Sequence, residues 1–167
     1  MRLESLSKNI VKIMQELSKN QGLVRLLQYN DDNPFDRNLP DVDGSTLIHP
    51  KSVNYKIKPY PFDVEAETGE TSTIRVYYNS GDFNENEVIS ETNLHIDIIV
   101  AKELWLINDG TNSLIRPYEI MSRVTDMVGK RSLNTTIKLR FDGWQHLAVN
   151  TKFDAIRLYS EYFTVET

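Results

Sequence analysis

The chain has 167 residues and no cysteine, and its 24 acidic and 19 basic side chains give a net charge of −5. The length fits one domain, and the lack of cysteine excludes disulfides and thiolate metal sites. The sequence also lacks the run of ~18 apolar residues that crosses a bilayer and the basic stripe that grips nucleic acid, so we expect neither membrane association nor specific DNA binding.

Apolar residues at helical spacing predict a helix close to the N-terminus. The pattern is carried by Leu6, Ile10, Ile13, Met14 and Leu17. Gly22 predicts a break, after which a second apolar group continues the helical region. This group consists of Leu23, Val24, Leu26 and Leu27. We therefore expect a helical region over residues 1–28.

A proline-rich segment follows over residues 29–52. It contains three X-Pro pairs, which disfavour helix in the residue before proline: Asn33-Pro34, Leu39-Pro40 and His49-Pro50. Connections longer than about 12–15 residues without secondary structure are uncommon in a compact domain unless they serve a purpose. We expect an extended arm that contacts a partner, with Pro34 and Phe35 among the interface residues.

Alternating apolar residues predict three strands within residues 53–101, in the sequences SVNYKIKPYP, STIRVYYN and NLHIDIIVA. Consecutive strands of this kind most simply form a meander. In the third strand, one face carries Leu94, Ile96, Ile98 and Val100. The connections between the strands are acidic, and we expect their side chains on projecting hairpin loops. These side chains are Asp63, Glu65, Glu67, Asp82, Glu85 and Glu87.

The sequence RPYEIMSRVTDMV predicts a second helix at about residues 117–128. Pro117 suits the first helical position, Gly129 predicts a left-handed stop, and an apolar stripe is available to lie across a sheet. Further strands are predicted from TTIKLRF, WQHLAV and KFDAIRLYSEYFTV, and the last has apolar residues on both faces. We therefore expect a single α+β domain over residues 1–167, with both helical elements packed on an antiparallel sheet formed by residues 53–167.

No motif for catalysis or for a cofactor is present. The glycines form neither GxGxxG nor GxxxxGK[ST], and there is no GxSxG elbow. His95 and Asp97, two positions apart on a strand, point the same way and could share a ligand, but a metal site needs at least one more. A metal-dependent enzyme centred on this pair is the alternative to our expectation of no enzymatic activity, no metal and no cofactor.

Three residues around the turn before the second helix are candidates for protein contact: Trp105, Arg116 and Tyr118. Trp, Tyr and Arg dominate the hot spots of protein interfaces, so these side chains are candidate anchors for a neighbouring subunit. The other interpretation is that Trp105 closes the edge of the core and Arg116 pairs with a nearby carboxylate.

The order of elements resembles that of small neck proteins of tailed bacteriophages, especially the tail-terminator (tail-to-head joining) family. The similar features are a helix ending near LLQYNDDNPF, a strand ending in IDIIVAKELWLI and the following RPYEIMSRVTDMV. The resemblance is most specific at Trp105, Gly110, Arg116, Tyr118 and Ile120.

This resemblance implies a structural protein of the virion rather than an enzyme. The subunit would form a hexameric ring that caps the tail tube, contacts the tail tube protein and docks to the head-side connector or stopper protein. DNA would pass through the ring without specific binding, and an acidic surface is compatible with that passage. Some of the acidic side chains on the expected hairpin loops would border the lumen of this ring or a neighbouring subunit. The implied location is the virion neck, with assembly in the cytoplasm of the host bacterium. A head-side stopper or adaptor ring is the alternative position.

Overall fold

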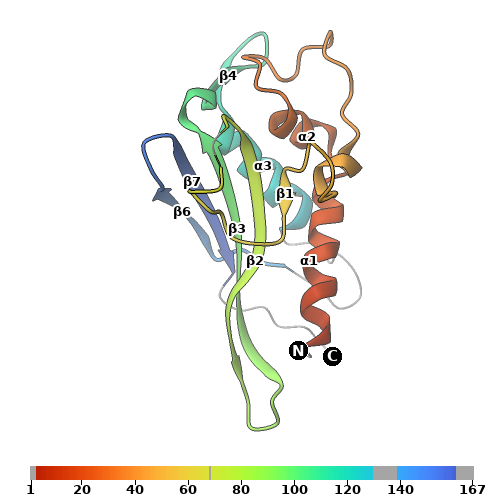
Figure 1. Cartoon of the computed structure of the whole chain (residues 1–167), viewed down its shortest axis with the longest axis vertical. Helices are drawn as coiled ribbons and strands as arrows, with labels where there is room; N and C mark the ends of the chain where they lie inside the picture. The colour runs from red at the N-terminus through yellow and green to blue at the C-terminus, as the bar shows by residue number, and fades with distance from the viewer. Residues whose placement is uncertain (1–2, 68, 130–138, 161–167) are drawn as a thin grey trace.

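The computed structural model describes residues 3–67, 69–129 and 139–160 (Figure 1). Within these residues, three α-helices lie on one face of a five-stranded sheet, and a two-stranded sheet directly precedes the third helix. The predicted α+β class is confirmed, because an N-terminal helix and a second short helix pack on a sheet that is mostly antiparallel.

Helices α1 (Glu4–Leu17) and α2 (Gln21–Gln28) form the predicted N-terminal helical region. Asn20 sets the break between them, since its side-chain oxygen accepts a hydrogen bond from the N–H of Leu23 at 2.9 Å and caps α2. The apolar stripes of both helices are buried, and their innermost residues include Ile13, Leu17, Leu23, Val24, Leu26 and Leu27.

The large sheet has the strand order β1-β2-β3-β7-β6. Its strands are β1 (Ile57–Lys58), β2 (Ser72–Phe83), β3 (Ile89–Ala101), β6 (Gly143–Ala148) and β7 (Phe153–Ser160). Neighbouring strands are antiparallel except for β1, which runs parallel to β2. Side chains alternate between the face covered by the helices, called here the helix face, and the opposite face.

The prediction of a first strand in SVNYKIKPYP is wrong for most of these residues. Val53 and Tyr55 lie in a turn region, closed by the hydrogen bond from the N–H of Tyr55 to the carbonyl of Ser52, and only Ile57 and Lys58 pair with β2. Because β1 is parallel to β2, the residues between them form a crossover connection and not a hairpin. The predicted meander therefore begins only at β2.

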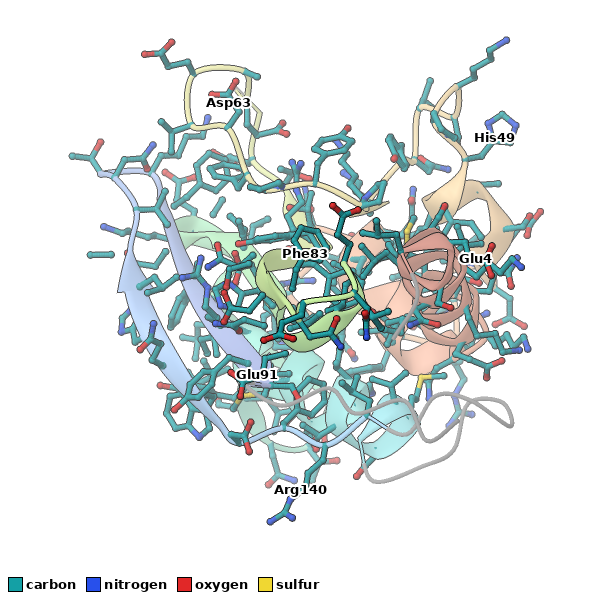
Figure 2. The ribbon with its side chains drawn as sticks, turned by 90° about the horizontal axis from the view of Figure 1, so that it is seen from below. Glu4, His49, Asp63, Phe83, Glu91 and Arg140 are labelled. Atoms are coloured by element: carbon teal, nitrogen blue, oxygen red, sulfur yellow. The ribbon has the colours of Figure 1, made fainter. Side chains whose placement is uncertain are left out.

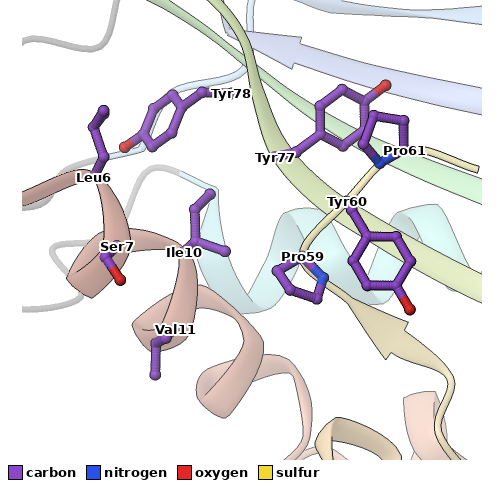
Figure 3. A pocket seen from close by; sticks show the side chains of 9 residues that line it. All are labelled: Leu6, Ser7, Ile10, Val11, Pro59, Tyr60, Pro61, Tyr77 and Tyr78. Carbon is purple, nitrogen blue, oxygen red and sulfur yellow. The ribbon is translucent and has the colours of Figure 1, made fainter. Parts of the chain in front are cut away.

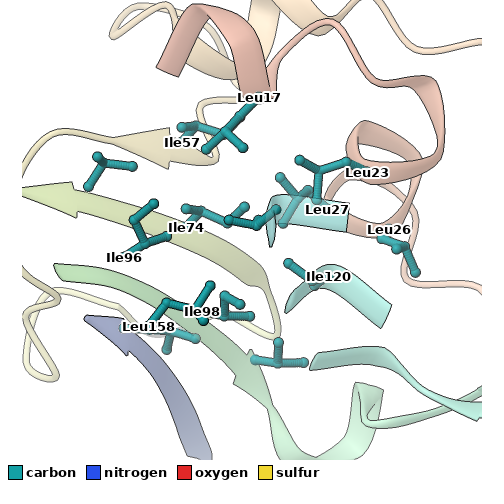
Figure 4. Packing of buried hydrophobic residues seen from close by; sticks show 14 of the residues in the cluster. Leu17, Leu23, Leu26, Leu27, Ile57, Ile74, Ile96, Ile98, Ile120 and Leu158 are labelled. Carbon is teal, nitrogen blue, oxygen red and sulfur yellow. The ribbon is translucent and has the colours of Figure 1, made fainter. Parts of the chain in front are cut away.

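Helix α3 (Arg116–Val128) crosses the helix face of the sheet. Its stripe of Ile120, Val124 and Val128 is fully buried, in the same cluster as Leu94 and Val100 of β3. Figure 4 shows Ile120 in this core with Ile96 and Ile98 of β3. Full burial of such a side chain contributes roughly 1.5–3 kcal/mol. The predicted packing of this helix on the face of β3 is therefore confirmed, and it forms the centre of the core.

Gly129 ends α3, but not in the left-handed conformation that the sequence predicts. Its φ of −76° and ψ of 137° are extended values. A Cβ at this position would lie 2.5 Å from the carbonyl oxygen of Thr125, so glycine is needed where the chain leaves the last turn of its own helix. The left-handed glycine is Gly110, with φ of +92°, in the turn between β4 (Leu106–Asn108) and β5 (Ser113–Ile115).

The hairpin of β2 and β3 is the longest feature of the sheet and extends well beyond the other strands (Figure 1). Two register shifts interrupt its pairing, one between Tyr78 and Ser80 and one between Asp82 and Phe83. At the tip, Glu87 adopts a positive φ of 57°. Bulges of this kind increase strand twist and bend the hairpin away from the sheet.

The last two strands agree with the sequence patterns that predict them. Both faces of β7 are buried, with Phe153 and Ala155 on one face and Ile156 and Leu158 on the other. The predicted strand TTIKLRF falls mostly outside the described residues, and so does the end of KFDAIRLYSEYFTV.

Candidate interaction surfaces

An aromatic patch lies at the β6 end of the large sheet, and we define it as Trp105, Tyr118, Trp144 and His146. The ring centroid of Tyr118 lies 6.3 Å from that of Trp105 and 6.2 Å from that of Trp144. The rings of Trp105 and His146 are 5.7 Å apart. Tyr118 and Trp144 are 44% and 51% exposed. Exposed aromatic surface of this kind is typical of sites that contact a partner.

Three elements hold the aromatic patch together. Trp105 follows the short 3-10 helix η2 (Lys102–Leu104), and its indole N–H donates to the carbonyl of Val100 at 3.1 Å. Tyr118 lies in the first turn of α3. Trp144 and His146 are alternate residues of β6, so both side chains share the helix face. These two residues are missed by sequence reasoning, although their spacing in WQHLAV is a signal for a shared face.

A groove of about 510 Å³ lies at the other end of the sheet, between α1 and the outer edge of β2 (Figure 3). Its walls are largely apolar and aromatic, formed by Leu6, Ile10, Val11, Pro59, Tyr60 and Tyr78. The hydroxyl of Tyr78 accepts a hydrogen bond from the side chain of Asn9 at 3.1 Å. Burial raises the pKa of Tyr78 to about 12, so the groove wall stays uncharged at neutral pH.

The tip of the β2–β3 hairpin carries one of the two predicted acidic groups. Asp82, Glu85 and Glu87 are all exposed there, and Phe83 beside them is 60% exposed. Figure 2, seen from the side toward which the hairpin points, shows Phe83 near the centre of the view. These residues therefore lie on a projecting hairpin, in the position that the sequence predicts for them.

The second acidic group lies on the crossover from β1 to β2. Asp63 and Glu65 are exposed and Glu67 is half-buried. Just before them, Phe62 packs edge-to-face on Phe153 at 5.2 Å between ring centroids. The crossover is therefore anchored on the opposite face of its own sheet, and the expectation of a projecting hairpin is corrected here.

Arg116 lies inside the domain and is 1% exposed. Its guanidinium donates to four main-chain carbonyl oxygens, those of Leu26, Tyr29, Asp31 and Leu104, at 2.6 to 3.1 Å. Burial lowers the pKa of Arg116 to about 10. A side chain in this position cannot contact a neighbouring subunit, so the predicted role of Arg116 as an interface anchor is corrected to a structural one, and its partners are carbonyls and not a carboxylate.

The proline-rich segment packs on its own domain. Arg25 donates to the carbonyl oxygens of Pro34, Asp36, Leu39 and Pro40. Pro34 is buried, and Phe35 is half-buried under the guanidinium of Arg123, 4.9 Å from the ring centroid. The short 3-10 helix η1 (Gly44–Ile48) places Leu47 in the core. Only part of Phe35 is therefore available to a partner.

His95 and Asp97 point to the same side of β3, on the opposite face of the sheet, as their spacing predicts. Both carboxylate oxygens of Asp97 are used: Arg157 donates to them at 2.8 and 3.0 Å, and the Tyr77 hydroxyl donates at 2.5 Å. Burial, followed by the positive charge of Arg157, lowers the pKa of His95, so its ring is neutral near pH 7. The arrangement is a closed ion pair beside a buried imidazole.

The described residues offer few groups for metal or membrane contact. Among them, no three His, Asp or Glu side chains come together as metal ligands, so the pair of His95 and Asp97 gains no third ligand there. None of the helices in the described part of the chain has the length and apolar character needed to cross a membrane.

The fold and these surfaces define a small α+β protein with an acidic projecting hairpin and apolar surface at both ends of its sheet. The chain belongs to the YomW family, whose model matches residues 20–162. This family is phage-derived, and the protein is therefore phage-associated. No curated protein matches the chain.

Proposed function

We propose that this protein is a structural subunit of a bacteriophage neck that forms a hexameric ring, terminates the tail tube and joins it to the head. Its partners in this role are further copies of itself, the tail tube protein and the head-side connector or stopper protein. It acts in the virion after assembly in the host cytoplasm, and it carries out no turnover. Its membership of a phage-derived family supports the proposal.

The observation that carries the proposal is the projecting hairpin of β2 and β3. Residues 76–101 contain no Lys or Arg, while the hairpin has Asp82, Glu85, Glu87 and Glu91. Such a surface repels the phosphates of DNA and lets the duplex slide past without being held. At the same time, the exposed Phe83 gives the hairpin an apolar contact point for a neighbouring protein.

Inactivation of the gene by an early stop codon in a phage that carries it tests the proposal. We expect filled heads and separate tails, because the joint between them is missing. Labelling of purified wild-type tails with an antibody should mark their head-proximal end. Label on the heads alone would place the subunit on the head side, and intact particles in the stop-codon mutant would refute a role in joining.

A ring is tested directly by electron microscopy of the purified protein at high concentration and on isolated tails. Sixfold rings are expected on the tails, where the tube provides a template for closure. Tails that carry this protein in any arrangement other than a ring would contradict the proposed architecture.

A further inference from the structure

We propose that copies of this chain join edge to edge, with the outer edge of β6 of one copy pairing with the outer edge of β2 of the next. This inference rests on the proposed function, in which the subunit forms a ring, and it identifies the surfaces that meet. Trp144 of one copy would enter the groove beside α1 of its neighbour.

Both edges of the large sheet are open. β6 pairs only with β7, and no other described strand lies along its outer edge. β1 covers only Ile74 and Arg75 of β2, and the segment that continues β1, residues 59–61, lines the groove beside Tyr77 and Tyr78. Among the described residues, the outer edge of β2 is therefore open from the exposed Asn79 onward. Unpaired edges present a row of free N–H and C=O groups to another strand.

The described residues of β6, Gly143–Ala148, carry neither Lys nor Pro nor a bulge, which are features that commonly block such pairing. The register of β6 with β7 is continuous over all of these residues. An unprotected six-residue edge is therefore best explained by a strand that covers it in the assembled state.

Exposed apolar side chains gather at the same two places. At the β6 end they are Trp144 and Tyr118, which are 51% and 44% exposed. At the β2 end, Val11 and Tyr60 are 48% and 46% exposed and line the groove. Apolar patches of this kind mark interaction sites in soluble proteins, and a contact between the two ends would bury both.

The side chains that would meet lie on the same side of the sheet. Trp144 points to the helix face, because its register partner is Leu158, which is buried on that face. The groove is formed between α1, which covers the helix face, and the β2 edge, with Ile10 and Tyr78 in its wall (Figure 3). Edge pairing that continues the sheet would therefore direct the exposed indole toward an apolar groove.

The two ends differ from each other, and this difference determines the symmetry. An isologous contact would bury one end in each copy and leave the other exposed. A head-to-tail contact buries both ends and must either close into a ring or continue as a filament. Each copy is therefore related to the next by a rotation, and repeated rotations close the ring of the proposed function.

A cross-linking experiment tests the contact, because the natural chain contains no cysteine. Gln145→Cys places a thiol on β6, and Ser80→Cys places one on β2, both at exposed positions. With a short bismaleimide and concentrated protein, the double variant should give a ladder of dimers, trimers and larger species. Each single variant should remain monomeric. Dimers from either single variant would show isologous pairing, and the absence of any ladder would equally overturn the inference.

The role of the indole is tested in the same double-cysteine chain. Trp144→Ser should reduce the ladder at least tenfold, and Val11→Arg should do the same from the groove side. Val53→Ser, at a 96% exposed position that lines neither the groove nor the aromatic patch, is the matched control and should leave the ladder unchanged. Circular dichroism confirms that each variant is folded. A full ladder from either Trp144→Ser or Val11→Arg in its folded state would refute the contact.

Failure of this contact can be separated from failure of the proposed function. A phage that carries Trp144→Ser and assembles normal necks would overturn the edge contact, while the stop-codon phage still tests the role in joining. If the stop-codon phage is normal although the ladder forms, then the edge contact holds and the proposed function fails.

Discussion

The guanidinium of Arg116 donates to the carbonyl oxygen of Leu26 at 2.6 Å and thereby ties the start of α3 to the last turn of α2. The carbonyls at the end of a helix have no partner within the helix. Arg116 also reaches Tyr29 and Asp31 just beyond α2, so a single buried cation satisfies the carbonyls of the turn that leaves the helical region. The start of α3 therefore depends on the chain 90 residues earlier.

Replacement of Arg116 by Met should destabilise the protein strongly. The change leaves four carbonyls without their donor in a buried site, and each unsatisfied buried group costs about 1–3 kcal/mol before relaxation or entry of water. We expect a loss of at least about 3 kcal/mol in the free energy of unfolding, measured by urea denaturation.

Arg123→Met is the matched control for that change. Arg123 forms a partly exposed i,i+4 pair with Glu119 at 2.9 Å, which contributes about 0.3–0.5 kcal/mol. Its guanidinium also lies over the ring of Phe35, which adds about 0.5–1 kcal/mol. If Arg116→Met lowers the free energy of unfolding by no more than Arg123→Met does, the contacts of Arg116 with the carbonyls do not stabilise the fold.

Removal of the Tyr77 hydroxyl should cost about 2 kcal/mol. This hydroxyl donates to Asp97 and accepts from Arg157, and hydrogen bonds to charged groups contribute about 1.5–3 kcal/mol. Asp97→Asn should cost more, about 3 kcal/mol, because it leaves Arg157 without its counter-charge. Tyr118→Phe, at a half-exposed position, is the control and should stay within about 0.5 kcal/mol. Equal denaturation midpoints for Tyr77→Phe and Tyr118→Phe would refute the prediction.

The elements that sequence reasoning predicts well are those with a strong local pattern. The stripe that ends at Val128 and the alternation from Leu94 to Val100 each fix a buried face, so α3 on β3 could be predicted. The N-terminal helices and the acidic hairpin are visible for the same reason. Each is determined by periodicity or by turn chemistry within about 15 residues.

The features that sequence reasoning misses depend on distant partners. Tyr55 fits a strand pattern, but the backbone N–H of the neighbouring Lys56 donates to the carbonyl of Leu47 and not to a strand. β1 is therefore reduced to two residues, which run parallel to β2. The contact between Tyr118 and Trp144 exists because β7 inserts between β3 and β6, an order that no local pattern shows. The proline-rich segment has the sequence pattern of a free arm, but Arg25 of α2 donates hydrogen bonds to its main-chain carbonyls and holds it on the domain. No local pattern shows these contacts.

Gly44→Ala should destabilise the contact between η1 and α1. A Cβ on Gly44 would lie 1.8 Å from the carbonyl oxygen of Ser18, which belongs to the backbone and cannot rotate away. Insertion of one methyl group into a packed site costs about 1–3 kcal/mol. Gly69→Ala is the control, since nothing lies within 4 Å of its added Cβ. A melting temperature for Gly44→Ala equal to that for Gly69→Ala would contradict the close approach.

His95 should make the stability of the protein decrease as the pH falls below about 7. Burial and the charge of Arg157 lower the pKa of His95 in the folded state, while an unfolded histidine titrates near 6.5. As the pH falls below about 7, the unfolded chain takes up a proton that the folded chain does not, so the free energy of unfolding decreases. Above pH 7 both states hold the neutral ring, and this contribution is constant.

The measurement is a series of urea denaturations from pH 8 to pH 5 on the wild type and on His95→Gln. The variant should show a shallower decrease in stability below pH 7, because the proton uptake specific to the unfolded state is removed. His49→Gln, at an exposed position, controls for the loss of a histidine as such. If the two variants have the same slope, the buried ring of His95 is not the source of the pH dependence, and burial does not keep it neutral.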